Sequence, residues 1–195
     1  EIGKTIVSAI VTEYLQADYW KPVQSGDLHW TDTMKVQSLI SNEKSFFHPE
    51  RHRLNAPLSP HASAALDGVQ IQLSDFTLPQ TSNHLIVEGA GGLMVPLNNH
   101  DLMLDLIHQL KIPVILVSRN YLGSINHTIL SIEALKHREI PIAGIVINGE
   151  PNPATESFIE NYSQLPVLFR VGNFPHITRE AIMKFVHKLD LKLFS

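Results

Sequence analysis

The sequence contains no cysteine, and this absence sets the first limits on what the protein does. Disulfide bonds, thiolate catalysis and cysteine-ligated zinc are excluded, and the composition is compatible with a reducing cytoplasm, where we expect the protein to work. No apolar run reaches the ~18 residues of a membrane-spanning helix, so we expect no membrane partner. Lysine and arginine together number 15 against 19 acidic residues; the net charge of −4 predicts no nucleic-acid partner.

What the sequence does contain is a regular alternation of strand and helix patterns. Its 195 residues are 44% hydrophobic and 17% charged, which is typical of a folded globular domain. The spacing of apolar residues predicts helices at 4–16, 31–40, 62–66, 101–111, 124–137 and 178–189, a helix start at 152–153, strands at 19–23, 85–87, 113–118, 142–148 and 166–171, and a loop at 41–60. The predicted fold class is therefore α/β, a three-layer sandwich in a single domain over residues 1–195, with a mostly parallel sheet and helices on both faces.

The chain opens with the closing half of a phosphate-binding P-loop, Glu1-Ile2-Gly3-Lys4-Thr5. In this motif glycine lets the backbone approach the phosphates, lysine reaches the β- and γ-phosphates, and the threonine hydroxyl is a ligand for Mg²⁺. The helix that starts here adds N–H donors and the positive end of its dipole. The opening half of the motif and the strand before it would precede Glu1, so we expect the first strand of a P-loop NTPase-like fold there.

Polar side chains follow several of the predicted strands. The apolar run 85–87 leads into Glu88 and then into four small residues, Gly89-Ala90-Gly91-Gly92. Ligands of open parallel sheets bind at the carboxyl ends of the strands, so we expect Glu88 in a site where the glycines let backbone N–H groups face the ligand. Other strand ends and the segments that follow them carry Lys21, Ser25, the loop 120–126 and Asn148.

These residue types predict a nucleotide pocket that holds a metal ion. Mg²⁺ takes carboxylate and hydroxyl oxygens, and the candidate ligands are Thr5, Asp32 and Glu88. Phosphoryl transfer depends on positive charge near the phosphoryl oxygens, which Lys4 and Lys21 would supply.

Several of these residues also fit a plainer structural role. Taken alone, Lys21 fits a solvated lysine at a strand end, Asp32 an acid favoured by the helix dipole, and Asn126 a helix cap. Tyr19 and Trp20 are expected to pack in the core rather than to stack on a ligand.

Seven stretches, spread over nearly the whole chain, form a more specific pattern. They are Glu1–Thr5, Lys21-Pro22-Val23-Gln24-Ser25-Gly26, Pro57–His61, Val87–Gly92, Pro113–Val117, Leu122-Gly123-Ser124-Ile125-Asn126-His127 and Asn148. In content and order they resemble the motifs of the dethiobiotin synthetase family, ATP-dependent enzymes of biotin synthesis. The Lys-Pro-Val-x-Ser-Gly and Gly-x-Ile-Asn-His stretches are far more specific than the P-loop.

The resemblance implies an ATP- and Mg²⁺-dependent ligase that closes a ring on 7,8-diaminononanoate with CO₂, through a carbamate and a carbamic–phosphoric anhydride. It implies a homodimer in which the loop 122–126 of one subunit holds the substrate carboxylate of the other. By the same resemblance, the catalytic residues would be Lys4, Thr5 and Lys21. Nucleotide and metal would be bound by Glu1, Ile2, Gly3, Lys4, Thr5, Ile6, Asp32, Glu88, Gly89, Ala90, Gly91, Asn148, Gly149, Pro175, His176 and Ile177, and the substrate by Lys21, Ser25, Leu122, Gly123, Ser124, Ile125 and Asn126.

Two local features depart from the family pattern, and two other functions fit a P-loop chain. Gln24 replaces a small residue, and the Trp30-Thr31-Asp32-Thr33 context of Asp32 is less typical. The alternatives are a partitioning-type ATPase that dimerises with ATP and binds a partner or DNA, and an amidotransferase-like or cobyrinate-type ligase. Lys21-Pro22-Val23 and the Asn126-His127 pair distinguish the dethiobiotin synthetase family from such a ligase. A partitioning-type ATPase would need a second lysine in the opening half of the P-loop.

Overall fold

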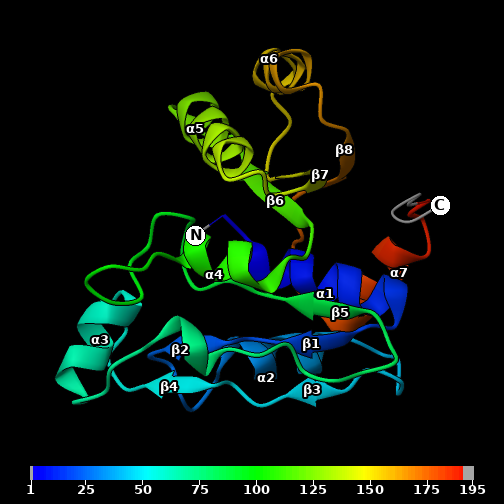
Figure 1. The fold of residues 1–195 in the computed structure, drawn as a ribbon. Coiled ribbons are helices and arrows are strands. Elements are labelled where there is room, and N and C mark those ends of the chain that lie inside the picture. The colour runs from blue at the N-terminus through cyan, green and yellow to red at the C-terminus, as the bar shows by residue number, and fades with distance from the viewer. Residues whose placement is uncertain (1, 191–195) are drawn as a thin grey trace.

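The computed structural model describes residues 2–190, along which strands and helices alternate (Figure 1). The helices are α1 (Lys4–Leu15), α2 (Asp32–Leu39), α3 (Pro60–Leu66), α4 (Met103–Leu110), α5 (Ser124–His137), α6 (Pro153–Ser163) and α7 (Arg179–Val186). The strands are β1 (Asp18–Trp20), β2 (Val23–Ser25), β3 (Phe47–His48), β4 (His52–Leu54), β5 (Leu85–Val87), β6 (Val114–Arg119), β7 (Ile142–Asn148) and β8 (Val167–Val171). Over the described residues, no helix combines the length and the apolar character that crossing a membrane requires.

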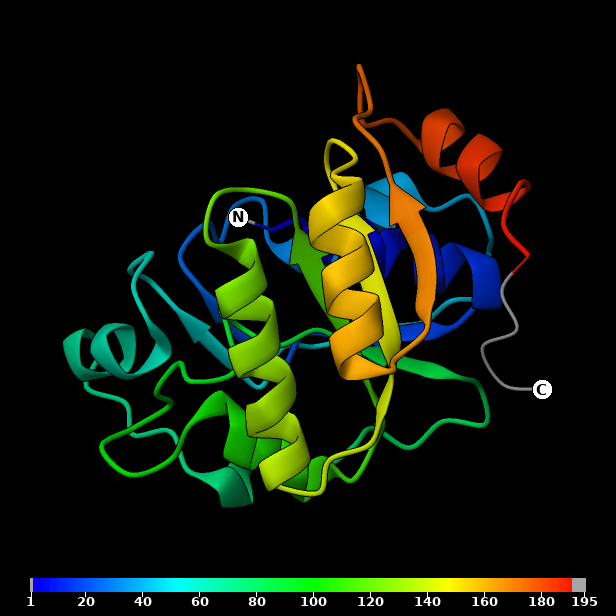
Figure 2. The ribbon, with the colours of Figure 1, turned by 90° about the horizontal axis from the view of Figure 1, so that it is seen from above.

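Alternate residues of β7 pack against different helices, which places helices on both faces of its sheet. Ile145 and Ile147 belong to one cluster with buried residues of α5 and α6, two helices that lie side by side in Figure 2. Val146 belongs to another cluster, with residues of α1, α7 and β8. Successive strand side chains point to opposite faces, so this apolar strand is buried on both sides, as the sequence predicts.

The side chains of β1 also pack against different helices on its two faces. Tyr19 packs with Ala9 of α1 and Val36 of α2, whereas Trp20 packs into a cluster that holds residues of α3 and α4. Helix α1 therefore packs against both β1 and β7.

The described strands form three groups rather than one continuous sheet. All pairings between named strands are parallel, in the orders β3-β1-β5, β2-β4 and β6-β7-β8. In the described part of the chain, β5 and β6 do not pair; a cavity of about 420 Å³ lies between them, lined mainly by apolar side chains of these strands, α1 and α4. The strand that the P-loop motif predicts before Glu1 lies outside the described residues.

The predicted fold class is confirmed, but two of the predicted elements are wrong. The stretch 41–60, predicted as a loop, contains β3 and β4, which are 2 and 3 residues long and are defined by their pairing with β1 and β2. The single strand predicted at 19–23 is divided into β1 and β2 at Lys21 and Pro22. Proline has no N–H to donate to a ladder, which accounts for a break at this position.

A buried carboxylate at the start of β1 connects two segments that are distant in the sequence. Asp18 Oδ1 accepts the backbone N–H of Phe46 (3.0 Å) and the side-chain amide of Asn83 (3.1 Å), and Oδ2 accepts the hydroxyl of Thr81 (2.6 Å). Burial alone would raise the pKa of Asp18, but these hydrogen bonds together lower it below the ordinary value of an aspartate. Asp18 thus anchors the segments that precede β3 and β5.

Because the pKa of Asp18 is lower in the folded than in the unfolded chain, its stabilising effect is present above the unfolded value and is lost as the pH falls through the folded value. We expect Asp18→Asn to lower the free energy of unfolding by about 1–3 kcal/mol at pH 7, with a difference that shrinks below about pH 4. Urea unfolding across this pH range measures the effect, with Asp27→Asn at an exposed position as the control. An equal loss at every pH would contradict the assignment.

Candidate functional site

The pairing of β1 with β5 brings Lys21 and Glu88 together. Trp20 lies opposite Val87, and the backbone N–H of Glu88 donates to the carbonyl oxygen of Trp20 (3.0 Å). Lys21 and Glu88 each follow their strand by one residue, and Lys21 Nζ lies 3.0 Å from Glu88 Oε1. Their side chains are 5% and 2% exposed, so residues 67 positions apart form a buried ion pair.

The start of α1 lies against the same carboxylate. Thr5 Oγ1 donates to Glu88 Oε1 (3.0 Å). Gly3 precedes the helix with a φ of +90°, and a β-carbon there would lie 2.1 Å from Nδ2 of Asn148, so this position requires glycine. Asn148 Nδ2 also donates to the carbonyl oxygen of Ile2 (2.8 Å), which holds the segment before the helix. Among the described residues, no side chain caps the start of α1.

Helix α2 adds a second carboxylate. Asp32 is its first residue, and Asp32 Oδ2 lies 2.6 Å from Lys21 Nζ, while Lys35 Nζ lies 3.1 Å from Oδ1. The buried Gln24 of β2 accepts the backbone N–H of Asp32 (3.1 Å) and donates to the carbonyl oxygen of Gly26 (3.0 Å). Gln24, which departs from the family pattern, therefore holds the start of α2. Sequence reasoning missed this role, since it depends on how β2 meets α2.

Lys21 lies between Asp32 and Glu88, and the opposite charges of Lys21 and Asp32 stabilise each other's ionised form. Burial alone would lower the pKa of Lys21, but the charges of Glu88 and Asp32 raise it above the ordinary lysine value. Burial would likewise raise the pKa of Asp32, and the neighbouring Lys21 lowers it instead. Lys21 is therefore cationic and Asp32 anionic at neutral pH.

Tyr19 also contacts this carboxylate, a role that sequence reasoning did not assign to it. Its hydroxyl donates to Glu88 Oε2 (3.0 Å). The prediction that Tyr19 packs in the core is confirmed, because it is 0% exposed, but packing is only part of its role. The available signal was its position two residues before Lys21, since alternate residues of a strand share a face.

The donor set fits a hard divalent cation that binds together with phosphate. Within residues 2–190, no cluster of three or more His, Asp or Glu side chains is placed to hold a metal ion. The predicted ligands Thr5, Asp32 and Glu88 do converge around Lys21, with one hydroxyl and two carboxylates. Mg²⁺ prefers octahedral oxygen coordination, which phosphate oxygens and water would complete.

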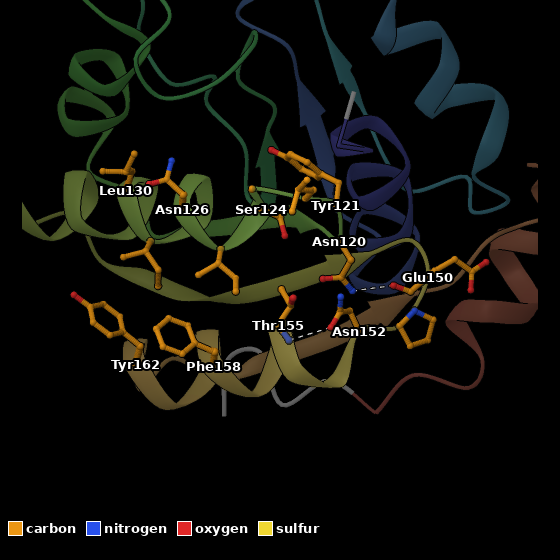
Figure 3. A pocket seen from close by; sticks show the side chains of 15 residues that line it. Asn120, Tyr121, Ser124, Asn126, Leu130, Glu150, Asn152, Thr155, Phe158 and Tyr162 are labelled. Atoms are coloured by element: carbon orange, nitrogen blue, oxygen red, sulfur yellow. Dashed lines mark hydrogen bonds between the residues drawn. The ribbon is translucent and has the colours of Figure 1, made fainter.

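A second candidate surface is the groove between α5 and α6 (Figure 3). It has a volume of about 900 Å³, and its lining includes the predicted loop 122–126. Phe158 and Tyr162 of α6 point toward α5, and their rings stack with centres 5.9 Å apart. Gly123, with a φ of +100°, precedes α5 without a side-chain cap among the described residues. The groove shares no lining residue with the cavity that Lys4 and Glu88 line.

The remaining predicted residues lie at strand ends and in connections. Gly89 and Gly91 line the cavity between β5 and β6, and Gly149 follows β7 with a φ of +89°. Ser25 Oγ is buried and has no hydrogen-bond partner among residues 2–190. Pro175–Ile177 lie in the exposed connection between β8 and α7, and Glu1 lies outside the described residues.

Of the other predicted contacts, Ala90 and Ile6 serve packing. Ala90 is 8% exposed in the core cluster of Trp20, and Ile6 packs against the cluster of α1, β8 and α7. The structure thus brings Thr5, Asp32 and Glu88 together around Lys21, and it places the loop 122–126 on a separate surface.

Sequence comparisons relate nearly the whole chain to one set of proteins. Residues 1–181 match a family model described as "AAA domain". The ATP-dependent dethiobiotin synthetase BioD of Christiangramia forsetii is 48% identical over 193 residues, covering 99% of this chain and 93% of that protein. The protein of the same name from Cytophaga hutchinsonii is 48% identical over 188 residues, covering 96% and 91%. Among solved structures, a ParA family ATPase from Chlorobium tepidum TLS covers 96% of this chain and 94% of its own, with a TM-score of 0.48 and 12% identity.

Proposed function

This chain belongs to the family of ATP-dependent dethiobiotin synthetases, and we propose that it catalyses the ring closure of that family in biotin synthesis. One amine of 7,8-diaminononanoate attacks CO₂ and loses a proton, which forms a carbamate. A carbamate oxygen attacks the γ-phosphorus of ATP and ADP leaves, so that a carbamic–phosphoric anhydride forms. The second amine then attacks the anhydride carbonyl, and phosphate and a proton leave as the ureido ring of dethiobiotin closes.

The observation that carries this proposal is the network in which Lys21 joins Asp32 and Glu88 beside Thr5. The carbamate and the γ-phosphate are both anionic, so their approach requires positive charge on their oxygens. Lys21, Lys4 and the N-terminus of α1 supply such charge from β1 and α1. Once the anhydride exists, ring closure is intramolecular, and positioning contributes much of the remaining rate acceleration.

Thr5, Asp32 and Glu88 would hold Mg²⁺ together with the nucleotide phosphates. When bound, the ion would neutralise phosphate oxygens and help to orient them. The hydroxyl proton of Thr5 is donated to Glu88, so the lone pairs of the Thr5 oxygen remain available as a metal ligand. Asp32 and Glu88 contribute the negative charge that attracts a divalent ion.

Lys21 would exchange partners during the reaction. Its ammonium lies 2.6 Å from Asp32 and 3.0 Å from Glu88, the two carboxylates proposed as metal ligands. A lysine ammonium is a point charge on a flexible stem, which lets it move from these carboxylates to a neighbouring oxyanion. Before ligands bind, Lys21 is the counter-ion of the two carboxylates. Afterwards its ammonium would neutralise oxygens of the carbamate and the γ-phosphate.

Ser25 would contact the diamine-derived end of the substrate. Its hydroxyl oxygen is buried and has no partner in the described part of the chain. A buried hydroxyl without a hydrogen bond is unfavourable by about 1–3 kcal/mol, and a polar group of the substrate would satisfy it. Ser25 ends β2, four positions after Lys21, so one strand-end region supplies both contacts.

We further propose that two copies associate through the groove between α5 and α6. Leu122, Leu130 and Phe158 are 104%, 60% and 48% exposed there, and a contiguous apolar patch of this kind marks an interaction surface. A two-fold contact would bring the loop 122–126 of one subunit to the site of the other. The N-terminus of α5, which no described side chain caps, would then face the substrate carboxylate. This arrangement would bring together the loop 122–126, which lines the groove, and the predicted substrate residues Lys21 and Ser25, which do not line it.

Phosphate release from ATP is expected to require both the diamine and bicarbonate. Lys21→Met should lower kcat/KM by at least about 100-fold, because a charge contact in the transition state is lost. Lys35→Met removes a more exposed lysine from the same Asp32 and should stay within about fivefold of wild type. A phosphate-release assay of the wild type and of both variants measures these effects. Phosphate release at the same rate with and without the diamine would reject the reaction. ATP-dependent DNA binding would indicate a partitioning-type ATPase instead.

The same Lys21→Met variant should bind metal more tightly than wild type. Without the ammonium, Asp32 and Glu88 lose their counter-ion, so the apparent affinity for Mn²⁺ in the presence of ADP should rise by about 10-fold or more. Electron paramagnetic resonance of free Mn²⁺ measures this. Lys35→Met should have a smaller effect, since Lys35 is 33% exposed against 5% for Lys21. Equal affinities in Lys21→Met and wild type would contradict the exchange of partners.

Substitutions in the groove should dissociate the dimer. We expect Leu130→Asp and Phe158→Asp to give a monomer in size-exclusion chromatography with light scattering, because a charge in an apolar interface is desolvated without a partner. Leu66→Asp places the same charge on a residue of α3 that is 71% exposed and should leave the dimer intact. A wild-type protein that is monomeric at every concentration tested would reject this interface.

A further inference from the structure

Tyr19 is a buried titratable side chain to which the proposed mechanism assigns no role. It is 0% exposed in the middle of β1, where its ring packs against Val36 and against Phe47, with ring centres 5.9 Å apart in the second pair. Its hydroxyl donates to Glu88 Oε2 at 3.0 Å. A buried tyrosine hydroxyl generally finds a hydrogen-bond partner, and here the partner is a carboxylate of the proposed nucleotide site.

The Glu88 carboxylate accepts hydrogen bonds on both of its oxygens. Oε1 accepts from Thr5 Oγ1 and Lys21 Nζ, at 3.0 Å each, whereas Oε2 accepts from Tyr19. Lys21 is the contact that would leave during the reaction, and Thr5 is the residue that would share the metal ion with Glu88. Of these three side-chain contacts to Glu88, the one from Tyr19 would therefore stay unchanged when nucleotide and metal bind.

We propose that Tyr19 is a positioning residue that fixes the orientation of the Glu88 carboxylate, so that Oε1 remains directed at Thr5 after Lys21 leaves. The inference rests on the proposed function, because it takes Thr5 and Glu88 as metal ligands. The last torsion of a glutamate is broad and roughly two-fold, so an untethered carboxylate rotates easily. A hydrogen bond on Oε2 from a rigid, packed ring restricts that rotation.

The phenol is suited to this task at neutral pH. The ordinary pKa of tyrosine is about 10, so its hydroxyl is protonated and can donate to the Glu88 carboxylate, which accepts it at 3.0 Å. Partners that orient metal ligands in this way are worth about 10–100-fold in metal affinity in other proteins.

Tyr19→Phe tests the inference, because it removes the hydroxyl and keeps the packed ring. We expect the apparent affinity for Mn²⁺ in the presence of ADP, measured by electron paramagnetic resonance, to fall by about 10-fold. The Mg²⁺ concentration for half-maximal activity should rise by a similar factor, while kcat at saturating Mg²⁺ changes less. The matched control is Val36→Ala, which weakens the same core cluster and leaves the hydroxyl of Tyr19 in place. It should leave the Mn²⁺ affinity unchanged.

A double-mutant cycle with Glu88→Gln separates positioning from general loss of stability. If Tyr19 acts through the carboxylate, Tyr19→Phe should have little further effect on Mn²⁺ affinity in the Glu88→Gln background. Unchanged Mn²⁺ affinity in Tyr19→Phe, or an equal loss in Val36→Ala, would overturn the role. Binding of Mn²⁺ and ADP needs no diamine, so the two proposals can fail separately. If the wild-type protein shows no diamine-dependent turnover while Tyr19→Phe still lowers the Mn²⁺ affinity, the proposed reaction is rejected and the positioning role of Tyr19 stands.

Discussion

A lysine that is almost fully buried keeps its charge only where carboxylates lie beside it, and this electrostatic constraint organises the site. For Lys21 these carboxylates are Asp32, at the start of α2, and Glu88, directly after β5. Such buried pairs add little net stability, because the desolvation of the charges offsets their attraction, but removal of one partner leaves an uncompensated charge. The three residues therefore require β1, β5 and α2 to lie in one particular arrangement.

Helix α1, which begins at Lys4, connects this network to the rest of the fold. Its buried face packs on β1 through Ala9 and on β7 and β8 through Val7 and Ile10, so one helix spans both main groups of strands. Its first turn carries Thr5 to Glu88. The N-terminus of this same helix faces the phosphates in the proposed reaction. The position of that N-terminus therefore depends on how the helix packs in the core.

Two side chains to which the sequence analysis gave no role in the site support the carboxylates. Gln24 holds the backbone of Asp32, and Tyr19 holds the second oxygen of Glu88. Both are buried, and both use hydrogen bonds whose loss would leave a polar group unsatisfied. The proposed metal ligands are therefore held by neighbours from β1 and β2, while the groove between α5 and α6 is the separate surface that we propose for a second copy.

Local chemistry in the sequence was sufficient to predict the Gly-Lys-Thr helix start, the strand that leads into Glu88, the helix start at 152–153 and the α/β class. These features depend on residues that are neighbours in the chain. Motif order was sufficient to indicate the family. Only the tertiary structure decided that Lys21 bridges Asp32 and Glu88, that Tyr19 and Gln24 contact the site, and that β3 and β4 are strands. The physical reason is that these features are contacts between elements far apart in the sequence: strand pairing and helix packing create them, and no local pattern of side chains specifies which partners meet.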